Sequence, residues 1–154
     1  MRDEIKRKIV TGLVIGGMMA INVCPTYANT KTFTKVFVSG SSYADPESPT
    51  VEANKDSDHS YVEIKVTKMY KDNGKSSRYK YSKAKLYGWD TKKKKNVRCV
   101  KNSDFPKTLK KGKKVKFSLL ADYQRVGKTI KYCAKGNKPQ LDCKISGKMW
   151  LDQE

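Results

Sequence analysis

The chain has 154 residues, with 34 Lys and Arg, 15 Asp and Glu and one His, which gives a formal net charge of +19 at pH 7. This length suits one domain with a modest core. The charge bears on solubility and on partners, which should be anionic, and carries no information about the fold. No set of acid, base and nucleophile is visible, so we expect no catalytic residues and no cofactor, and a hydrolase is the least favoured class.

The first 28 residues have the pattern of an export signal. A charged head over residues 2–8 precedes an apolar run over residues 9–23, which is shorter than the roughly 20 residues of a membrane-spanning helix. Small residues at positions 26 and 28 predict cleavage after residue 28. A lipoprotein signal would need a small residue before Cys24, and an uncleaved anchor would be unusually short. We therefore expect a secreted or cell-envelope protein without a transmembrane span in its mature part.

The mature chain, residues 29–154, keeps 30 basic and 13 acidic residues and a charge of +17, because four Lys and Arg and two Asp and Glu lie in the signal. It also keeps Cys99, Cys133 and Cys143, in a compartment where thiols oxidise. Three cysteines predict one disulfide and one leftover thiol. Alternation places Cys143 inward and Cys133 outward, and favours Cys99 as the partner of one of them. The pairing stays open, as does the alternative of three unpaired thiols.

The first part of the mature chain, residues 29–60, combines a predicted strand at Phe33–Val38 with an acidic segment. Residues 39–60 are rich in Ser, Pro, Asp and Glu and carry a net charge of −4. Such a composition buries little apolar surface, so we expect a mobile connection or a loop draped on the domain. Because its charge opposes that of the rest of the chain, this segment is also expected to fold back on the basic surface and mask it.

The second part, residues 61–154, is predicted to be a basic β-sandwich domain. Alternating apolar residues from Tyr61 onward predict a half-buried strand. The pair Asn73-Gly74 is typical of a tight hairpin, with residues 78–89 as the returning strand. The apolar positions change parity within that strand, which predicts a bulge at Ser82 or Lys83.

Further strands are expected over residues 96–100, 115–123, 129–134, 141–145 and 149–151, with a turn at Ser146-Gly147 separating the last two. Turns recur about every ten residues and no long helical periodicity is present. The fold class is therefore all-β: a small antiparallel β-sandwich of seven or eight strands with an immunoglobulin-like Greek-key arrangement, or alternatively a small β-barrel. The likeness to the immunoglobulin fold concerns architecture and implies no activity.

Residues that carry chemistry elsewhere do not form a convincing site here. His59 adjoins Ser60 in the acidic segment, but no strained nucleophile turn accompanies them. The residues from Asn54 to Asp58 resemble the start of a calcium loop, yet position 6 is His59 where Gly is needed and position 12 is Lys65 where Glu is needed. No Cys-x-x-Cys pair indicates zinc. We expect no metal site.

Basic residues are concentrated between Lys65 and Lys131, a stretch that contains 23 Lys and Arg and only four Asp. The mature chain has 27 Lys and only three Arg, so diffuse electrostatic attraction is favoured over sequence-specific reading of nucleic acid. The candidate polyanion-binding residues gather at two predicted turns: Lys92, Lys93, Lys94, Lys95 and Arg98 at the first, and Lys110, Lys111, Lys113 and Lys114 at the second.

Aromatic residues alternate with cations over residues 78–89, and Tyr79 and Tyr81 are the candidates for stacking on sugars or bases. The leading hypothesis is a secreted, non-enzymatic protein that binds an anionic cell-wall polymer, a polysaccharide or an anionic lipid surface. The alternative is an exported cationic antimicrobial or toxin-like protein. It is less favoured because the chain lacks an amphipathic helix with a basic face.

Overall fold

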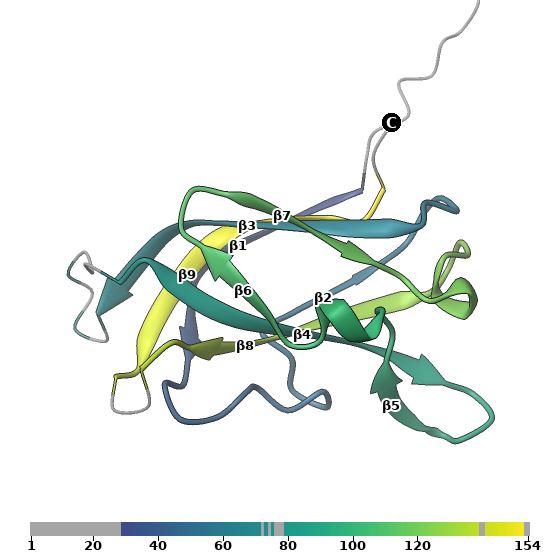
Figure 1. The fold of residues 1–154 in the computed structure, drawn as a ribbon, viewed down its shortest axis with the longest axis horizontal. Coiled ribbons are helices and arrows are strands. Elements are labelled where there is room, and N and C mark those ends of the chain that lie inside the picture. The colour runs from purple at the N-terminus through teal and green to yellow at the C-terminus, as the bar shows by residue number, and fades with distance from the viewer. Residues whose placement is uncertain (1–28, 72, 74, 76–78, 139–140, 153–154) are drawn as a thin grey trace, which may run out of the picture.

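The computed structural model describes residues 29–71, 73, 75, 79–138 and 141–152, so the predicted export signal lies outside the described residues. Two antiparallel β-sheets, packed face to face, make up this part of the chain (Figure 1). Its nine strands are β1 (Thr30–Val38), β2 (Val51–Asn54), β3 (Tyr61–Lys71), β4 (Tyr81–Asp90), β5 (Lys95–Arg98), β6 (Lys107–Lys110), β7 (Lys114–Ser118), β8 (Thr129–Gly136) and β9 (Cys143–Trp150).

The sheets confirm the predicted all-β class and the small antiparallel β-sandwich. Sheet A has the strand order β1-β9-β3-β7 and forms the upper layer in Figure 1. Sheet B has the order β2-β8-β4-β5, with β6 also paired to β4, and forms the lower layer. Strands β2 and β6 are additional to the predicted ones. Each has only four residues, too few for an alternation pattern to stand out.

Helical structure in the described ranges is limited to two three-residue turns, η1 (Asn102–Asp104) and η2 (Ala121–Tyr123). Neither is long enough to cross a membrane, and no other helix is present in those ranges.

The core lies between the sheets and follows the alternation of the strands, because successive side chains of a strand point to opposite faces. On β3, Val62, Ile64 and Val66 are fully buried, and their partners across the sandwich come from sheet B. The other large buried side chains of the core cluster include Leu86, Leu109, Phe117, Leu119, Ile130, Tyr132, Ile145 and Met149.

The predicted hairpin at Asn73-Gly74 is wrong. Strand β3 lies in sheet A between β9 and β7, and β4 lies in sheet B next to β8, so the two strands do not pair. Of the eight connections between the described strands, six pass from one sheet to the other. A turn sequence reports only that the chain reverses direction, and here the reversal leads across the sandwich.

The predicted bulge at Ser82 or Lys83 is also wrong. Strand β4 pairs with β8 in unbroken register from Ser82 to Gly88, with the even-numbered residues inward. Tyr81 therefore points outward and Ser82 is the buried residue. The real bulges are in sheet A. They flank Ser146 and Gly147, where β9 continues as one strand in place of the predicted turn.

The predicted strand over residues 115–123 is shorter in the structure. Strand β7 ends at Ser118, Leu119 bridges Val100, and the chain then enters η2. This turn places the buried Tyr123 ring against Gly88, where an added Cβ would lie 2.3 Å from the ring. Both a strand and this turn bury residue 123, so alternation alone does not separate them.

The predicted disulfide is wrong, because Cys99, Cys133 and Cys143 are all buried free thiols. Cys99 and Cys133 flank β4 on opposite sides, and two strand spacings of about 4.8 Å exceed the reach of a disulfide. Cys143 is in sheet A, where it pairs with Lys71 at the C-terminal end of β3. The predicted inward position of Cys143 is confirmed. Cys133 has outward parity and lies outside the core cluster, yet it is fully buried.

The acidic segment is part of the sandwich. Its residues 51–54 form β2 on the edge of β8. Directly after β2, Lys55 is buried and its Nζ lies 3.0 Å from both the Leu151 carbonyl oxygen and Asp152 Oδ1. The Asp152 carboxylate also accepts hydrogen bonds from the Asp56 N–H and from the N–H and hydroxyl of Ser57. This cluster joins the end of sheet A to the edge of sheet B.

Candidate polyanion-binding surface

The two predicted lysine clusters lie at opposite ends of β4. Asp90, at the end of β4, pairs with Lys95, and Tyr81, at its start, pairs with Lys110. Nine residues of extended strand separate these points, about 30 Å. Lys92, Lys93, Lys94 and Lys95 therefore form one exposed hairpin tip, and Lys110, Lys111, Lys113 and Lys114 belong to a separate turn.

The hairpin tip is organised by Asp90. Its Oδ1 accepts hydrogen bonds from the backbone N–H groups of Lys92 (2.9 Å) and Lys93 (3.0 Å). These bonds and the nearby lysine charges lower the pKa of Asp90. Arg98, in β5, donates to Asn102 and lies over the Phe105 ring. Part of the positive charge predicted for this cluster is thus already engaged within the protein.

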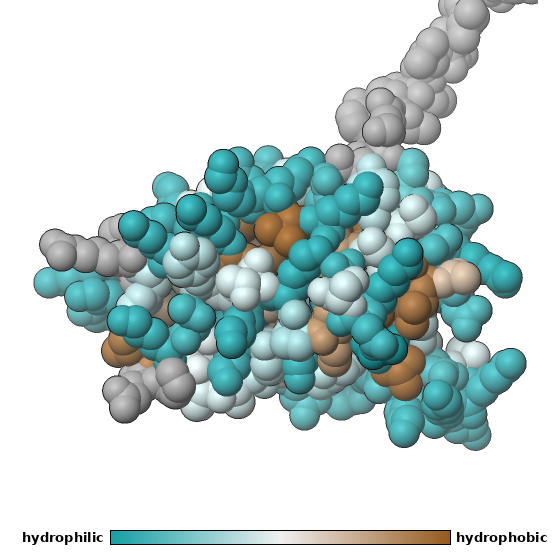
Figure 2. Space-filling model, in the orientation of Figure 1, coloured by the Kyte–Doolittle hydropathy of each residue, from teal (hydrophilic) through white to brown (hydrophobic). Residues whose placement is uncertain are grey.

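The two candidate stacking residues do not form an aromatic platform. Tyr79 is half-buried against the core, whereas Tyr81 is 38% exposed. Both border a small gap at the end of the sandwich, together with Met69, Leu141 and Cys143. The side of the molecule in Figure 2 is mostly hydrophilic with small separate apolar spots, so it offers no broad apolar surface for stacking.

The outer face of sheet A carries a concentration of cationic side chains. We call this surface the lysine face. It is made by the outward-pointing lysines of β3, β7 and β9: Lys65, Lys68, Lys114, Lys116, Lys144 and Lys148. Four of them, Lys68, Lys114, Lys116 and Lys148, are exposed. Lys114 and Lys116 belong to a basic run that stands out in the sequence, whereas Lys65, Lys68, Lys144 and Lys148 lie on strands far apart in the chain.

Strand register aligns three of these lysines in a row. Lys65 of β3 is directly opposite Lys148 of β9 on one side and Lys114 of β7 on the other. Adjacent strands are about 4.8 Å apart, so the backbone positions of three lysines lie side by side at strand spacing. Like charges directly opposite each other destabilise a sheet. The fold therefore bears a cost for this arrangement.

One carboxylate tempers this repulsion. Glu63 is the only acidic residue in the four strands of sheet A, and its Oε2 lies 2.7 Å from Lys114 Nζ. The same strands contain nine lysines, so the face remains strongly positive.

Aromatic rings border the lysine face. Lys114 Nζ lies 4.4 Å from the centre of the Trp150 ring, and Lys116 Nζ lies 3.6 Å from that of Tyr61. A cation over an aromatic ring is attracted by the ring quadrupole. These contacts hold the ammonium groups along the sheet surface, and the rings supply apolar area beside them.

The outer face of sheet B also carries lysines, but residues 39–50 cover it, and we call these residues the covering segment. In Figure 1 this segment passes below the lower layer. The Tyr43 ring centre lies 4.4 Å from Lys85 Nζ and 5.7 Å from Lys135 Nζ. Ala44 donates its N–H to the Ala134 carbonyl oxygen (3.0 Å), and Ala134 donates to Thr50 Oγ1 (2.9 Å).

Cys133 lies beneath this cover. Burial, with a further contribution from the Asp45 charge, raises the pKa of the Cys133 thiol to about 12. Burial is also the largest cause of the raised pKa of Tyr87, followed by Cys133, Tyr43 and Asp45. Just beyond the segment, Glu52 Oε2 lies 3.8 Å from Lys131 Nζ. The acidic segment thus contacts part of one basic face, through the Tyr43 ring and the Glu52 carboxylate.

A third feature is a polar cleft of about 310 Å³ between the β4–β5 hairpin and the loop after η2. Trp89, which is 43% exposed, lies on its edge. Two carboxylates, Asp90 and Asp122, share the cleft with Lys92, Arg125 and Lys128. Its mixed charge makes it a poorer polyanion site than the lysine face.

The residues considered for hydrolysis or calcium binding have structural contacts. The His59 ring centre is 6.3 Å from that of Tyr61, and Asp58 Oδ1 accepts the Val126 N–H (3.0 Å). In the described ranges no group of three or more His, Cys, Asp or Glu side chains is arranged to hold a metal ion.

Comparison of the chain with protein-family models, curated proteins and solved structures finds no match.

Proposed function

We propose that this protein is an exported, non-enzymatic binding protein whose lysine face attaches it to a linear anionic polymer of the extracellular space or cell envelope. The observation that carries the proposal is the row formed by Lys148, Lys65 and Lys114. Its mutual repulsion opposes folding, and a bound chain of negative charges would convert that repulsion into attraction.

The type of cation supports a polymer rather than a base-specific ligand. The lysine face contains no arginine in its strands, and lysine acts as a point charge without the bidentate fork that reads guanine edges. Binding by point charges is driven by release of counterions and weakens steeply with salt. The bordering rings of Trp150 and Tyr61 add apolar contact for the uncharged parts of a polymer.

The test compares two triple variants of the mature chain on heparin and on poly(glycerol phosphate). Lys65/Lys114/Lys148→Gln removes the row, and Lys92/Lys93/Lys95→Gln removes the same charge from the hairpin tip. The salt slope is the slope of the logarithm of the binding constant against the logarithm of the salt concentration, and each lost contact should lower its magnitude by about 0.7. The row variant should therefore lose about 2 in slope, and its affinity at low salt should fall on the order of tenfold or more. The hairpin variant should lose less than half as much in slope.

Equal losses in the two variants would show a diffuse charge coat and contradict a specific face. Retention that does not respond to salt would contradict electrostatic binding altogether. A membrane-active protein would instead release dye from anionic liposomes at micromolar concentration, and intact liposomes are the result expected here.

A further inference from the structure

The middle of the lysine face contains two β-bulges that face each other across β9. On one side, the register between β1 and β9 shifts between Phe33 and Val36, and on the other, the register between β3 and β9 shifts between Val66 and Lys68. Both shifts lie opposite Ser146 and Gly147. A bulge leaves its extra residue out of the ladder and bends the strand. Two opposed bulges therefore open the sheet surface at one point.

This local opening is maintained against steric cost. Lys35, in the β1 bulge, has φ of 49°, a left-handed conformation that a non-glycine residue seldom adopts. Gly147 approaches the neighbouring strand so closely that an added Cβ would lie 2.2 Å from the Lys65 carbonyl oxygen. A regular ladder would avoid both features. A left-handed non-glycine residue such as Lys35 is strained, and such residues are concentrated at binding sites.

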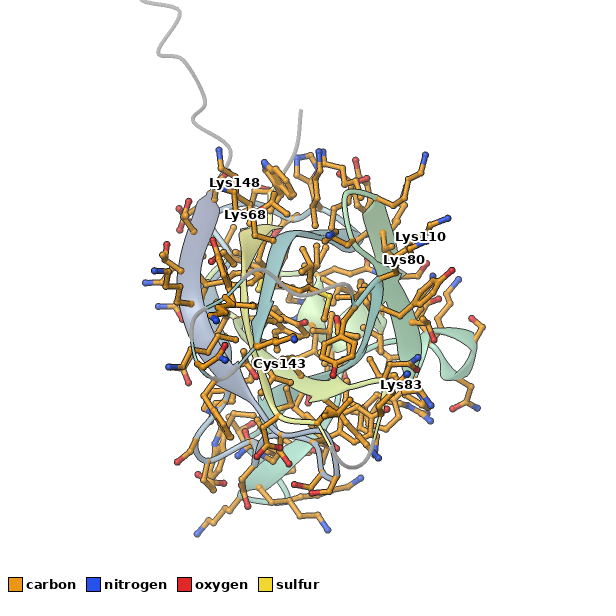
Figure 3. The ribbon with its side chains drawn as sticks, turned by 90° about the vertical axis from the view of Figure 1, so that its left-hand side faces the viewer. Lys68, Lys80, Lys83, Lys110, Cys143 and Lys148 are labelled. Atoms are coloured by element: carbon orange, nitrogen blue, oxygen red, sulfur yellow. The ribbon has the colours of Figure 1, made fainter. Side chains whose placement is uncertain are left out.

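The opening is a surface depression of about 250 Å³, which we call the bulge depression. Its lining is largely apolar and includes Phe33, Tyr70 and Gly147, and its polar residues are Thr32, Thr34, Thr67, Lys68, Ser146 and Lys148. Figure 3 shows Lys68 and Lys148 near each other on the sheet A side, away from Lys80, Lys83 and Lys110. No carboxylate is among the lining residues.

The hydrogen-bond pattern leaves donor capacity in the depression. The Ser146 hydroxyl oxygen accepts the Lys35 N–H at 2.8 Å, so its own proton remains available to a ligand. The Thr67 hydroxyl donates to the Ser146 carbonyl oxygen at 3.1 Å, which fixes the β3 bulge against β9. The two lysines each add up to three N–H donors.

We propose that the bulge depression is a subsite for one tetrahedral oxyanion, the phosphate or sulfate group of a polymer bound along the lysine face. This inference rests on the proposed function. Donors that surround the depression from three strands suit a group with oxygens pointing in several directions. A planar carboxylate presents only two oxygens. Tyr70, also in the lining, lies where an attached sugar or glycerol unit would extend.

The test is titration of the mature chain with inorganic phosphate and, separately, inorganic sulfate, monitored by amide chemical shifts at low ionic strength. Saturable shifts are expected at Thr67, Ser146 and Gly147. Lys68→Gln should weaken the binding on the order of tenfold. Lys114→Gln is the matched control, with the same charge change on the same face outside the depression, and should change it less than twofold.

Thr67→Val keeps the shape of the side chain and removes the hydroxyl, so it should weaken oxyanion binding and leave the polymer salt slope unchanged. Shifts spread over all surface lysines, or equal losses in Lys68→Gln and Lys114→Gln, would overturn the subsite. If the subsite binds oxyanions while neither polymer binds, the proposed function fails and the subsite stands. If polymers bind while the three amides do not respond, the subsite alone fails. Tighter binding of phosphate or of sulfate identifies which ester the site takes.

Discussion

The two outer faces of the sandwich carry similar numbers of lysines and present them differently. On sheet A, Lys68, Lys114, Lys116 and Lys148 are exposed and only Glu63 is acidic among the strand residues. On sheet B, Lys83, Lys85, Lys131 and Lys135 are all half-buried. The Tyr43 ring lies beside Lys85 and Lys135, and Glu52 lies beside Lys131. One face is therefore left open and the other is covered by the chain itself.

This difference shows that a high net charge need not be a uniform coat. Charges separated by more than about 8 Å are largely screened at physiological salt, so each face acts on its own surroundings. If the proposed function holds, the covering segment reduces competition from sheet B, and sheet A presents lysines in a defined register. A polymer would then meet the protein in one orientation.

The largest effect is expected when the acidic segment loses its attachment to Asp152, at the end of sheet A. Asp152→Ala removes the carboxylate that holds Lys55, Asp56 and Ser57, and it leaves the Lys55 ammonium buried without a counter-charge. Breaking a buried pair in this way costs about 3–5 kcal/mol. Urea unfolding of the mature chain should show that loss. Glu52→Ala, which breaks the exposed pair with Lys131, should cost less than about 0.5 kcal/mol.

The same carboxylate predicts the pH dependence. Burial raises the pKa of Asp152, but hydrogen bonds from Ser57, Asp56 and Lys55 outweigh it, and the net effect lowers the pKa. The pKa of Asp104 is lowered in the same way, because hydrogen bonds from Lys107 and Ser118 outweigh the effect of burial. The unfolded chain then binds protons first, so these contributions are present at neutral pH and are lost as the pH falls below about 4. The decline should be smaller in Asp152→Ala, and an equal decline would contradict the assignment.

Much of the fold could be predicted from the sequence because alternation is a local signal. The buried residues Val62, Ile64 and Val66 follow this alternation, and patterns of this kind along the chain predict the all-β sandwich. The pairing of strands is not local: Asn73-Gly74 indicates a reversal, and only the completed sheets decide which strand comes next. Ser146-Gly147 resembles a turn for a related reason, since small residues suit a turn and a bulge equally.

The candidate site was less predictable. Runs such as Lys92–Lys95 stand out in a sequence, but they lie at a hairpin tip. Lys65, Lys114 and Lys148 are isolated residues whose alignment depends on the register of three strands. Contact between the acidic segment and a basic face could be expected from the sequence, because opposite charges on one chain attract each other.

A second experiment reduces the difference between the two faces by exposing the lysines of sheet B while β2 stays paired to β8. Tyr43→Ala with Asp45→Asn and Glu52→Gln removes the ring and the two carboxylates that face its lysines. Three released lysines should raise the polymer salt slope by about 2 and the low-salt affinity by several-fold. Titration on heparin measures both.

The control for uncovering is Asp56→Asn with Asp122→Asn, which raises the net charge equally without touching the covering segment. It should change the slope by less than 1. Uncovering should also make Cys133 react with a water-soluble thiol reagent, since this buried, outward-pointing residue lies near Asp45 of the covering segment. Tighter binding in both variants to the same extent would show that net charge, not the cover, sets the affinity.

The smallest expected effect concerns the single carboxylate of the open face. Glu63→Gln should raise polymer affinity by about twofold, because it removes the one negative charge in the strands of this face and its ion pair with Lys114. The same change should lower the free energy of unfolding by a few tenths of a kcal/mol, because Glu63 offsets repulsion within the lysine row. Heparin titration and urea unfolding of one variant thus give changes of opposite sign, and Asp122→Asn should give neither. Weaker binding by Glu63→Gln would mean that Glu63 holds Lys114 in its binding position, and the lysine face would then depend on its one acidic residue for order as well as for charge balance.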